Sequence, residues 1–582
     1  MEIIKKKPNN GMHPAVPELQ EALRKGEISR REFLRYATLL GVSVSAASAM
    51  AACAPAATPT AAPAPTAVPP TSAPAATKAP EPTKAPAPTA APAGPKRGGT
   101  VTIATRVQRF DHPARLSWGE AADQFRNVFE FLTFTGADNI TVPLLLEKWE
   151  ANADVTEWTL YLRKGIKFNN GQAFTADDVV FNFKQWLDKA VGSSLLGLMS
   201  YLKPTGVEKV DDYTVKLHLD SPEIGVPEHL FQYPAMIVPK TFGGDATKEP
   251  FGTGPFLLDK YVPTERAEFK ARTDYWRMGA DGKPLPYLDK LVYLDLGEDT
   301  APQIAALRSG QIDSIYNPSP EVWQGTKDVP GVKVYSVATG TTFVIRMRAD
   351  VKPWSDVKVR QALKMCIDRQ KMLDLAYFGE GVLGHDTHVS PIHPEYCKKD
   401  IPKYDPVGAK KLLAEAGYPN GLNVELSTQQ ARAEPAMAQA LKESAAAGGF
   451  NLKLNILPAA DYWNVWTEVP LGITIWVTRP LGTMVLQLGY TADDAGKPAP
   501  WNESRWVDKE FNDLLKQATK TLDVAKRRDI MCQVEQIQMD RGTAGIAFWT
   551  KGWNIFNKKF KNIAAHPTAW QFMHDVWYDP QG

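Results

Sequence analysis

Residues 157–181 read EWTLYLRKGIKFNNGQAFTADDVVF and decide how this chain folds. In the first six positions large apolar side chains alternate with other residues, which is the period-two pattern of a strand with one buried face. Gly165 then turns the chain into a short strand at 166–168, so a β-hairpin is predicted. Thr175 and Asp178 form a capping-box-like helix start. The helix is expected to bury Val179, Phe183, Trp186 and Leu187.

The rest of the chain continues this alternation of strands and helices. A first strand is predicted at 100–104, and a helix at 121–132, where apolar residues recur with helical spacing. A second hairpin is expected over 207–219. A helix capped by Asp405 should end at Gly417, and one long helix should run from about Phe511 through Arg527 toward Ile537. The fold class is therefore α/β with mixed β-sheets.

The 582 residues do not all fit a folded core. Between Ala54 and Pro95, 36 of 42 residues are Ala, Pro or Thr, and large apolar side chains are almost absent, so this stretch is expected to be an extended tether. The remainder, 98–582, holds all 16 tryptophans and carries a formal net charge of −4. A mildly acidic body gives no electrostatic reason to bind nucleic acid or anionic lipid.

The amino terminus carries two signals that resemble bacterial export motifs. Ser29-Arg30-Arg31-Glu32-Phe33-Leu34-Arg35, followed by the uncharged run 36–52, resembles a twin-arginine signal. The alternative is a permanent anchor helix, for which 17 residues are short. Met50-Ala51-Ala52-Cys53 resembles a lipobox, in which Cys53 would be acylated. The tether behind it would span roughly 35 Å as a flexible coil or up to roughly 130 Å as polyproline II.

Four segments of the body together resemble one family. They are 157–181, 252–258 (GTGPFLL), 353–369 (PWSDVKVRQALKMCIDR) and 404–418 (YDPVGAKKLLAEAGY). In order and spacing they resemble the extracellular solute-binding proteins of the peptide and nickel class, family 5, which supply ATP-binding-cassette (ABC) importers. The resemblance implies a periplasmic-binding-protein-like type II fold with two lobes, a hinge that the chain crosses twice and an inserted third domain.

The domain boundaries combine the amino-terminal signals with this resemblance. The export motifs predict a twin-arginine lipoprotein signal peptide at 1–52, and the composition predicts the Ala/Pro/Thr-rich tether at 53–97. The resemblance assigns lobe one to 98–137, 240–305 and 545–582, the inserted domain to 138–239, and lobe two to 306–544.

Enzymatic and metal chemistry find little support in the sequence. No G-x-S-x-G, H-E-x-x-H or G-x-x-x-x-G-K-[ST] motif occurs. The run His385, His388, His393 and Cys397 has spacing that suits zinc or nickel, but its two prolines indicate an ordinary loop. We therefore expect no catalytic residue, no metal and no cofactor. Cys366 is expected to be a core residue, whereas pairing of Cys397 stays open.

The resemblance also indicates where a ligand binds. Residues 472–476 resemble the family strand whose final tryptophan, here Trp476, borders the ligand. Peptide binders of the family commonly place an aspartate next, whereas this chain has Val477, Thr478 and Arg479. The anchor for the ligand's amino group is then missing, or displaced to Asp493 or Asp494. Arg479 either grips a carboxylate or forms a structural ion pair.

The complete set of expected ligand contacts combines aromatic walls with a few polar groups. Tyr462, Trp463 and Trp466 have an alternative role as one packed helix face, and the segment around Trp501 as a helix-entry loop. The expected contacts are Trp118 in lobe one and Tyr462, Trp463, Trp476, Thr478, Arg479, Tyr490, Asp493, Asp494, Trp501 and Asn502 in lobe two.

Three functions remain to be compared. The first is a monomeric substrate-binding protein, anchored by lipid to the outer face of the cell membrane, that delivers a peptide, opine, sugar or nickel chelate to an ABC permease. The alternatives are a secreted hydrolase acting on small peptides or related compounds, and a surface lipoprotein or chaperone that binds no small ligand.

Overall fold

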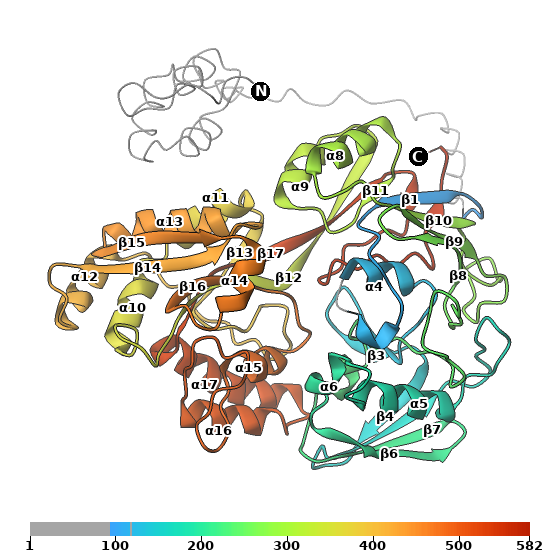
Figure 1. The fold of residues 1–582 in the computed structure, drawn as a ribbon, viewed down its shortest axis with the longest axis horizontal. Helices are drawn as coiled ribbons and strands as arrows, with labels where there is room; N and C mark the ends of the chain where they lie inside the picture. Colours follow the sequence, from blue (N-terminus) through green and yellow to red (C-terminus); the bar gives the residue numbers. More distant parts are fainter. Residues whose placement is uncertain (1–93, 117–118, 582) are drawn as a thin grey trace, which may run out of the picture. The chain divides into compact units, whose positions relative to one another are not determined.

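The central feature of the fold is a mixed sheet of eleven strands (Figure 1). The structure is a computed structural model that describes residues 94–116 and 119–581. In order across the sheet they are β15 (Phe450–Leu457), β14 (Leu422–Gln429), β16 (Leu471–Trp476), β12 (Val332–Met347), β17 (Ala544–Asn557), β11 (Ser314–Ile315), β1 (Thr100–Ala104), β10 (Lys290–Leu294), β9 (Arg266–Ala271) and β8 (Phe256–Val262), with β13 (Gly381–Leu383) on β17. β1 and β10 run parallel, whereas β12 and β17 run antiparallel. The expected mixed α/β class is confirmed.

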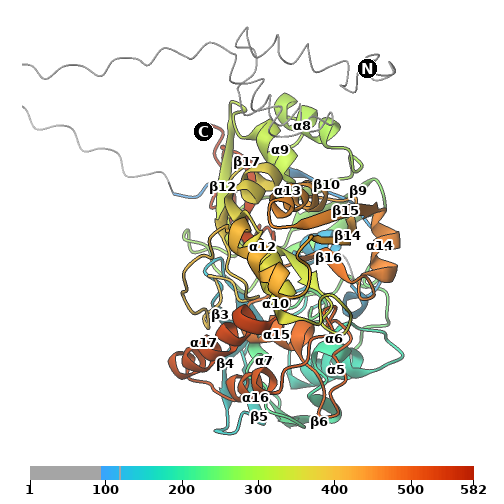
Figure 2. The same ribbon diagram turned by 90° about the vertical axis from the view of Figure 1, so that its left-hand side faces the viewer.

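Two long strands, β12 and β17, connect the two halves of this sheet (Figures 1 and 2). They pair from Val332 opposite Asn557 to Arg346 opposite Ala544. Phe556, near one end of β17, packs in the core that contains β1 and β10, whereas Ala544 packs in a core formed by lobe-two helices. These strands are thus the two crossings between the lobes.

Residues 306–326, which the sequence assigns to lobe two, pack on the other side of these crossings. They contain the last four residues of α8 (Thr300–Ser309) and all of α9 (Pro320–Thr326). Leu307 and Val322 share a hydrophobic cluster with Ala104 of β1. The lobe-two sheet therefore begins with β12 rather than near residue 306.

A separate antiparallel sheet lies within 138–239, the range expected for the inserted domain. Its order is β4 (Leu146–Ala151), β5 (Glu157–Leu162), β7 (Thr214–Leu219) and β6 (Leu202–Asp211). The hairpin of β6 and β7 is confirmed. The hairpin expected around Gly165 is wrong, because β5 pairs on both edges with β4 and β7 and leaves no free edge for 166–168. The Thr175 amide donates to the Asp178 carboxylate at 2.8 Å where α5 (Ala176–Leu187) begins, as predicted.

The helices cover these sheets, and the second half of the chain supplies most of them. Those packed on the lobe-two strands are α10 (Val357–Met365), α11 (Arg369–Tyr377), α12 (Pro406–Glu415) and α13 (Glu434–Ala446). Cys366 is fully buried in this core and has a free thiol, which confirms its expected place. The remaining short elements are the 3-10 turn Pro113–Arg115, α6 (Leu195–Leu198), α7 (Val226–His229), α14 (Ala459–Val465), α15 (Gly482–Tyr490), β2 (Thr133–Thr135), β3 (Thr141–Pro143), β18 (Phe560–Lys561) and β19 (Trp577–Tyr578).

Two predicted helices differ from the observed ones. The helix expected at 121–132 is α4 (Gly119–Phe125), which ends early although the later apolar residues remain buried. The long helix expected after Phe511 is two helices, α16 (Lys509–Ala518) and α17 (Val524–Arg541). The carboxylate of Asp523 accepts the Lys526 amide at 2.9 Å and starts a new helix, so the apolar periodicity alone was misleading. In the described part of the chain, no helix has the length and apolar character needed to cross a membrane.

Candidate ligand-binding cavity

A cavity of about 510 Å³ lies between the inserted domain and lobe two. One wall comes from α6, the chain after β7 and the end of α7, and the other from the segment after β16, from α15 and from the loop before α16. This volume falls within the range of small-molecule sites, roughly 300–1,000 Å³. One wall includes Tyr201, Glu223, His229 and Tyr233, and the other includes Arg479, Gln487 and Trp501.

Trp501 supplies the exposed aromatic surface of the lobe-two wall. Its side chain is 46% exposed, so a flat apolar part of a ligand can pack on it. Its ring is held from behind by edge-to-face contacts with Trp476 and Trp466, at centroid distances of 6.0 and 6.2 Å. Trp501 was predicted from sequence, and the structure places it at the cavity.

Arg479 is the cationic group of the cavity. It lies three residues after β16, and its Nη1 donates to the carbonyl oxygens of Val477 and Thr478 at 3.4 and 3.2 Å. Burial lowers the pKa of its guanidinium, with Tyr233 acting in the opposite direction. Among the described residues Arg479 has no carboxylate partner, so the alternative of a structural ion pair finds no support here. Its Nε and Nη2 donors are open to an anion.

Glu223 is the acidic group of the cavity and was not predicted. Its side chain accepts the Gly225 amide at 2.7 Å and the Nε2 donor of Gln487 at 3.3 Å, so this second bond crosses from the inserted domain to lobe two. Burial raises the pKa of its carboxyl group. Next to it, burial lowers the pKa of His229 to about 3, and this neutral ring pairs with the hydroxyl of Tyr201 at 2.8 Å.

Trp476 stands behind the cavity wall instead of lining it. Its side chain is only 6% exposed, and its indole Nε1 donates to Glu503 Oε1 at 2.8 Å. A Cβ atom on Gly489 would come within 2.9 Å of the indole ring, so the absence of a side chain there lets Trp476 pack against α15. Trp476 therefore supports the ring of Trp501 from behind.

Glu503 also holds a buried cation. Its Oε2 pairs with Arg346 Nε at 2.7 Å and accepts the Thr474 hydroxyl at 2.8 Å. Arg346 in turn donates to the carbonyl oxygens of Val469 and Trp466. This network joins strands β12 and β16 to the loop that carries Trp501.

Four further predicted contacts are buried with protein partners and do not line the cavity. Tyr462 donates to Ile473 at 3.1 Å, and Tyr490 bonds to His388 at 2.9 Å. Thr478 donates to Pro567 at 3.0 Å, and Asn502 to Trp506 at 2.8 Å. Their hydrogen-bonding groups are satisfied within the fold, so they are not available to a ligand in this cavity.

The other predicted contacts lie away from the cavity or outside the described residues. Asp493 closes a tight turn by accepting the Lys497 amide at 2.8 Å, and Asp494 is exposed and pairs with Lys516 at 2.7 Å. Trp463 is 41% exposed and contacts Trp466, but is not part of the cavity wall. Trp118 and Cys53 are outside the described residues.

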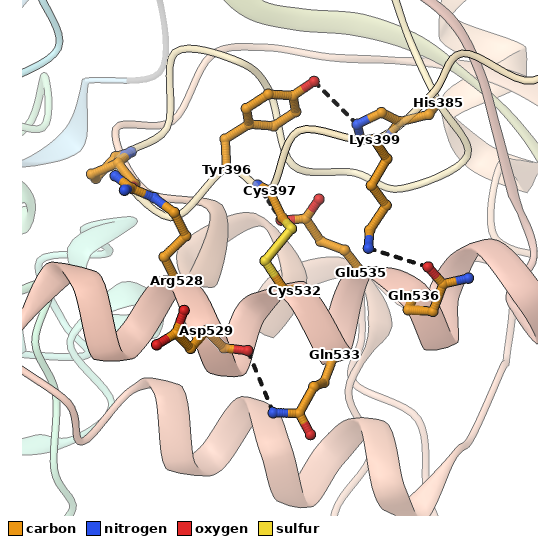
Figure 3. The surroundings of a disulfide bond; sticks show 11 residues. His385, Tyr396, Cys397, Lys399, Arg528, Asp529, Cys532, Gln533, Glu535 and Gln536 are labelled. Carbon is orange, nitrogen blue, oxygen red and sulfur yellow. Dashed lines mark hydrogen bonds between the residues drawn. A yellow bond between two sulfur atoms is a disulfide. The ribbon is translucent and has the colours of Figure 1, made fainter.

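The histidine-rich loop is tied to the fold by ordinary packing and by a disulfide. His385 stacks on Tyr396, and His393 bonds to the Arg479 carbonyl at 3.0 Å. Cys397 pairs with Cys532 of α17 (Figure 3), an outcome that the spacing of the cysteines alone does not reveal. Within residues 94–116 and 119–581 no cluster of His, Cys, Asp and Glu side chains is arranged to hold a metal ion.

Sequence reasoning missed the whole inserted-domain wall of the cavity. Tyr201, Glu223 and Tyr233 belong to no motif, and their sequence neighbours indicate only the end of a hairpin and a short helix. A Pro-Glu pair directly after an amphipathic strand was the one local signal, and it is common in surface turns.

The fold is that of a type II periplasmic binding protein, with two lobes connected by two strands and an inserted domain. HbpA2 from Haemophilus parasuis superposes with a TM-score of 0.72 at 24% identity, over 83% of this chain and 100% of that one. DppA from Helicobacter pylori, solved in complex with the peptide STSA, gives a TM-score of 0.69 at 22% identity, over 83% and 99%.

The chain belongs to the bacterial extracellular solute-binding proteins, family 5, whose middle region matches residues 141–495. Members of this family are periplasmic or extracellular substrate-binding proteins that work with ABC permeases. A similar curated relative is di/tripeptide-binding protein 1 of Pseudomonas aeruginosa, which is 26% identical over 473 residues, covering 73% of this chain and 84% of the relative. The family expectation from sequence is confirmed.

Proposed function

We propose that this chain is a membrane-anchored substrate-binding protein that captures a small peptide, or a similar polar solute with a carboxylate, and presents it to an ABC permease. The observation that carries this proposal is Arg479, a cation on a cavity wall with no acidic partner among the described residues. A buried or half-buried cation without a partner is costly, and an anionic ligand removes that cost.

Reversible capture needs more than the two named contacts of the cavity. Micromolar affinity requires about 8 kcal/mol. Packing on Trp501 and a charge-assisted bond to Arg479 supply about 2–4.5 kcal/mol, and burial of the ligand's apolar surface has to supply the rest together with the cost of ordering the ligand. The relative from P. aeruginosa is named for di- and tripeptides, and the H. pylori structure holds a peptide. Both observations support a ligand of the size of a short peptide.

Membrane attachment rests on the amino-terminal sequence. A twin-arginine signal would export the chain, and acylation of Cys53 would hold it at the outer face of the membrane, with the Pro-rich tether giving the body its reach. Cys53→Ser should move the exported protein from the membrane fraction to the soluble fraction. Retention of the variant in the membrane fraction would contradict lipid anchoring.

The binding proposal is tested by titration calorimetry with a panel of di- and tripeptides and other small carboxylates. Arg479→Gln should weaken binding of carboxylate ligands roughly 10- to 100-fold, because one charge-assisted bond is lost. The control is Arg109→Gln, which removes a charge from an exposed position outside the cavity and should leave affinity unchanged. Equal affinity of both variants for a bound carboxylate would overturn the proposal.

A further inference from the structure

Two groups of opposite charge lie on opposite walls of the same cavity. Glu223 comes from the inserted domain, and Arg479 comes from lobe two. Neither forms an ion pair within residues 94–116 and 119–581. In the proposed function Arg479 holds a carboxylate of the ligand, and Glu223 takes no part.

The hydrogen bonds of Glu223 leave acceptor capacity open. A carboxylate has about four lone-pair sites. The Gly225 amide takes one and Gln487 takes another, at 2.7 and 3.3 Å. About two sites therefore remain in a residue that is only 5% exposed and lines the cavity.

No cation among the described residues forms an ion pair with this carboxylate. The adjacent histidine, His229, is buried and bonded to the Tyr201 hydroxyl, so it contributes a neutral ring. Gln487 is an uncharged donor. A buried carboxylate held only by neutral donors is stabilised further by an external cation, and a protonated amine fits both the charge and the open acceptor sites.

The dimensions of the cavity limit the length of such a ligand. A sphere with the volume of this cavity, 510 Å³, is about 10 Å across. An extended chain advances at most about 3.3–3.6 Å per residue. A zwitterion with two or three residues between its charged ends therefore matches the cavity.

We propose that Glu223 is a specificity-determining residue that holds an ammonium group of the ligand while Arg479 holds its carboxylate, so that the cavity selects zwitterions of di- to tripeptide length. This inference rests on the proposed function and adds the polarity of the bound ligand. The amino end contacts the inserted domain, and the carboxyl end contacts lobe two.

The test uses three dipeptide probes that differ only at their ends. They are Ala-Phe, its N-acetylated form and its C-terminal amide, and the phenylalanine ring is chosen to pack on Trp501. Each is titrated into the full-length chain, into Glu223→Gln and into Glu228→Gln. Glu228 is the matched control, because it is a carboxyl group on α7 of the same domain that does not line the cavity.

The wild-type chain should bind Ala-Phe roughly 10- to 100-fold more tightly than the acetylated form, since acetylation removes one charge-assisted bond. In Glu223→Gln this difference should fall below about threefold, whereas Glu228→Gln should keep it. The cost of amidation should persist in Glu223→Gln, because Arg479 is still present. If Glu223→Gln fails to fold, Glu223→Asp replaces it. The shorter side chain should weaken Ala-Phe and leave the acetylated probe unchanged.

Failure of this inference differs from failure of the proposed function. A full acetylation penalty in Glu223→Gln, or equal binding of Ala-Phe and its acetylated form by the wild type, overturns the role of Glu223. Failure of the wild type to bind Ala-Phe or Ala-Ala-Phe also overturns it. The proposed function survives each of these results if other carboxylates bind in a manner that depends on Arg479, and falls if none does.

Discussion

Removing the Glu503 carboxylate should strongly destabilise lobe two. In the structure Glu503 pairs with Arg346 at 2.7 Å, and it accepts the Trp476 indole at 2.8 Å. The Arg346 and Glu503 side chains are 1% and 5% exposed, so the pair is almost completely removed from water. The substitution Glu503→Leu leaves a buried guanidinium without its counter-charge and an indole donor without an acceptor.

The expected size of the effect follows from that burial. Breaking a buried ion pair by removing one partner costs about 3–5 kcal/mol, because the remaining charge stays desolvated. Replacing both partners by apolar residues of similar volume is often neutral, so Arg346→Met combined with Glu503→Leu should recover most of the loss. The polar groups that lose a partner set the remaining cost of the double variant. They are the carbonyl groups of Val469 and Trp466, the Trp476 indole and the Thr474 hydroxyl.

The free energy of unfolding is measured by urea titration followed through tryptophan fluorescence. The control is Glu425→Leu, which breaks a solvent-exposed pair with Lys453 and should cost less than about 1 kcal/mol. A loss below about 1 kcal/mol for Glu503→Leu, or a double variant less stable than the single one, would refute the reasoning.

Three other predictions concern packing, redox state and pH. Trp501→Ala should weaken ligand binding with little loss of stability, because the ring is 46% exposed, whereas the buried Trp476→Ala should cost about 3–5 kcal/mol in a thermal or urea melt. Equal destabilisation by the two would contradict this assignment. Reducing the Cys397–Cys532 bond, which closes a loop of 135 residues, should lower stability by about 2–5 kcal/mol, and an unchanged melting temperature under reductant would count against it. Burial raises the pKa of Glu434 to about 7, so the folded state binds its proton more tightly than the unfolded state does, and stability is lost as pH rises from about 4.5 through 7. Glu434→Gln should therefore be more stable than the wild type at pH 8 and not at pH 4, and the reverse order would be inconsistent with a raised pKa.

The fold was predictable where local patterns and long-range structure agree. The alternation at 157–162 and the capping box at Thr175 identified a strand and a helix that the structure contains. Partner choice was not predictable from the same residues, because the strand forms a local hairpin with the preceding β4 and also pairs with β7, more than 50 residues further along the chain. The break at Asp523 illustrates a second limit, since a capping side chain interrupted a helix whose apolar pattern continues.

The site was predictable only on the lobe-two side. Arg479 was identified because it follows a strand that resembles one in the family, and Trp501 was chosen as part of the lining expected in lobe two. Both line the cavity. Trp476, from the same strand, is turned into the core because Glu503 offers its indole a buried acceptor. Asp493 does not line this cavity, and its Oδ1 closes a turn instead. The opposite wall comes from the inserted domain. Its contacts with lobe two depend on tertiary packing, so local sequence patterns did not predict this wall.

The polarity proposed for the ligand has a consequence for how binding is coupled to the arrangement of the domains. Separation of the inserted domain from lobe two would break the Gln487–Glu223 bond and move Glu223 away from Arg479. A zwitterion that spans the cavity can then contact both Glu223 and Arg479 only when the inserted domain and lobe two are as close together as in this structure. Two charge-assisted bonds of about 1.5–3 kcal/mol each give about 3–6 kcal/mol of preference for that spacing. Inverting a two-state equilibrium from 1:99 to 99:1 requires about 5.5 kcal/mol. A ligand that uses both charges reaches this range, whereas a blocked ligand that uses only one does not, so the same two residues would decide both which ligand is captured and whether its capture fixes the domains.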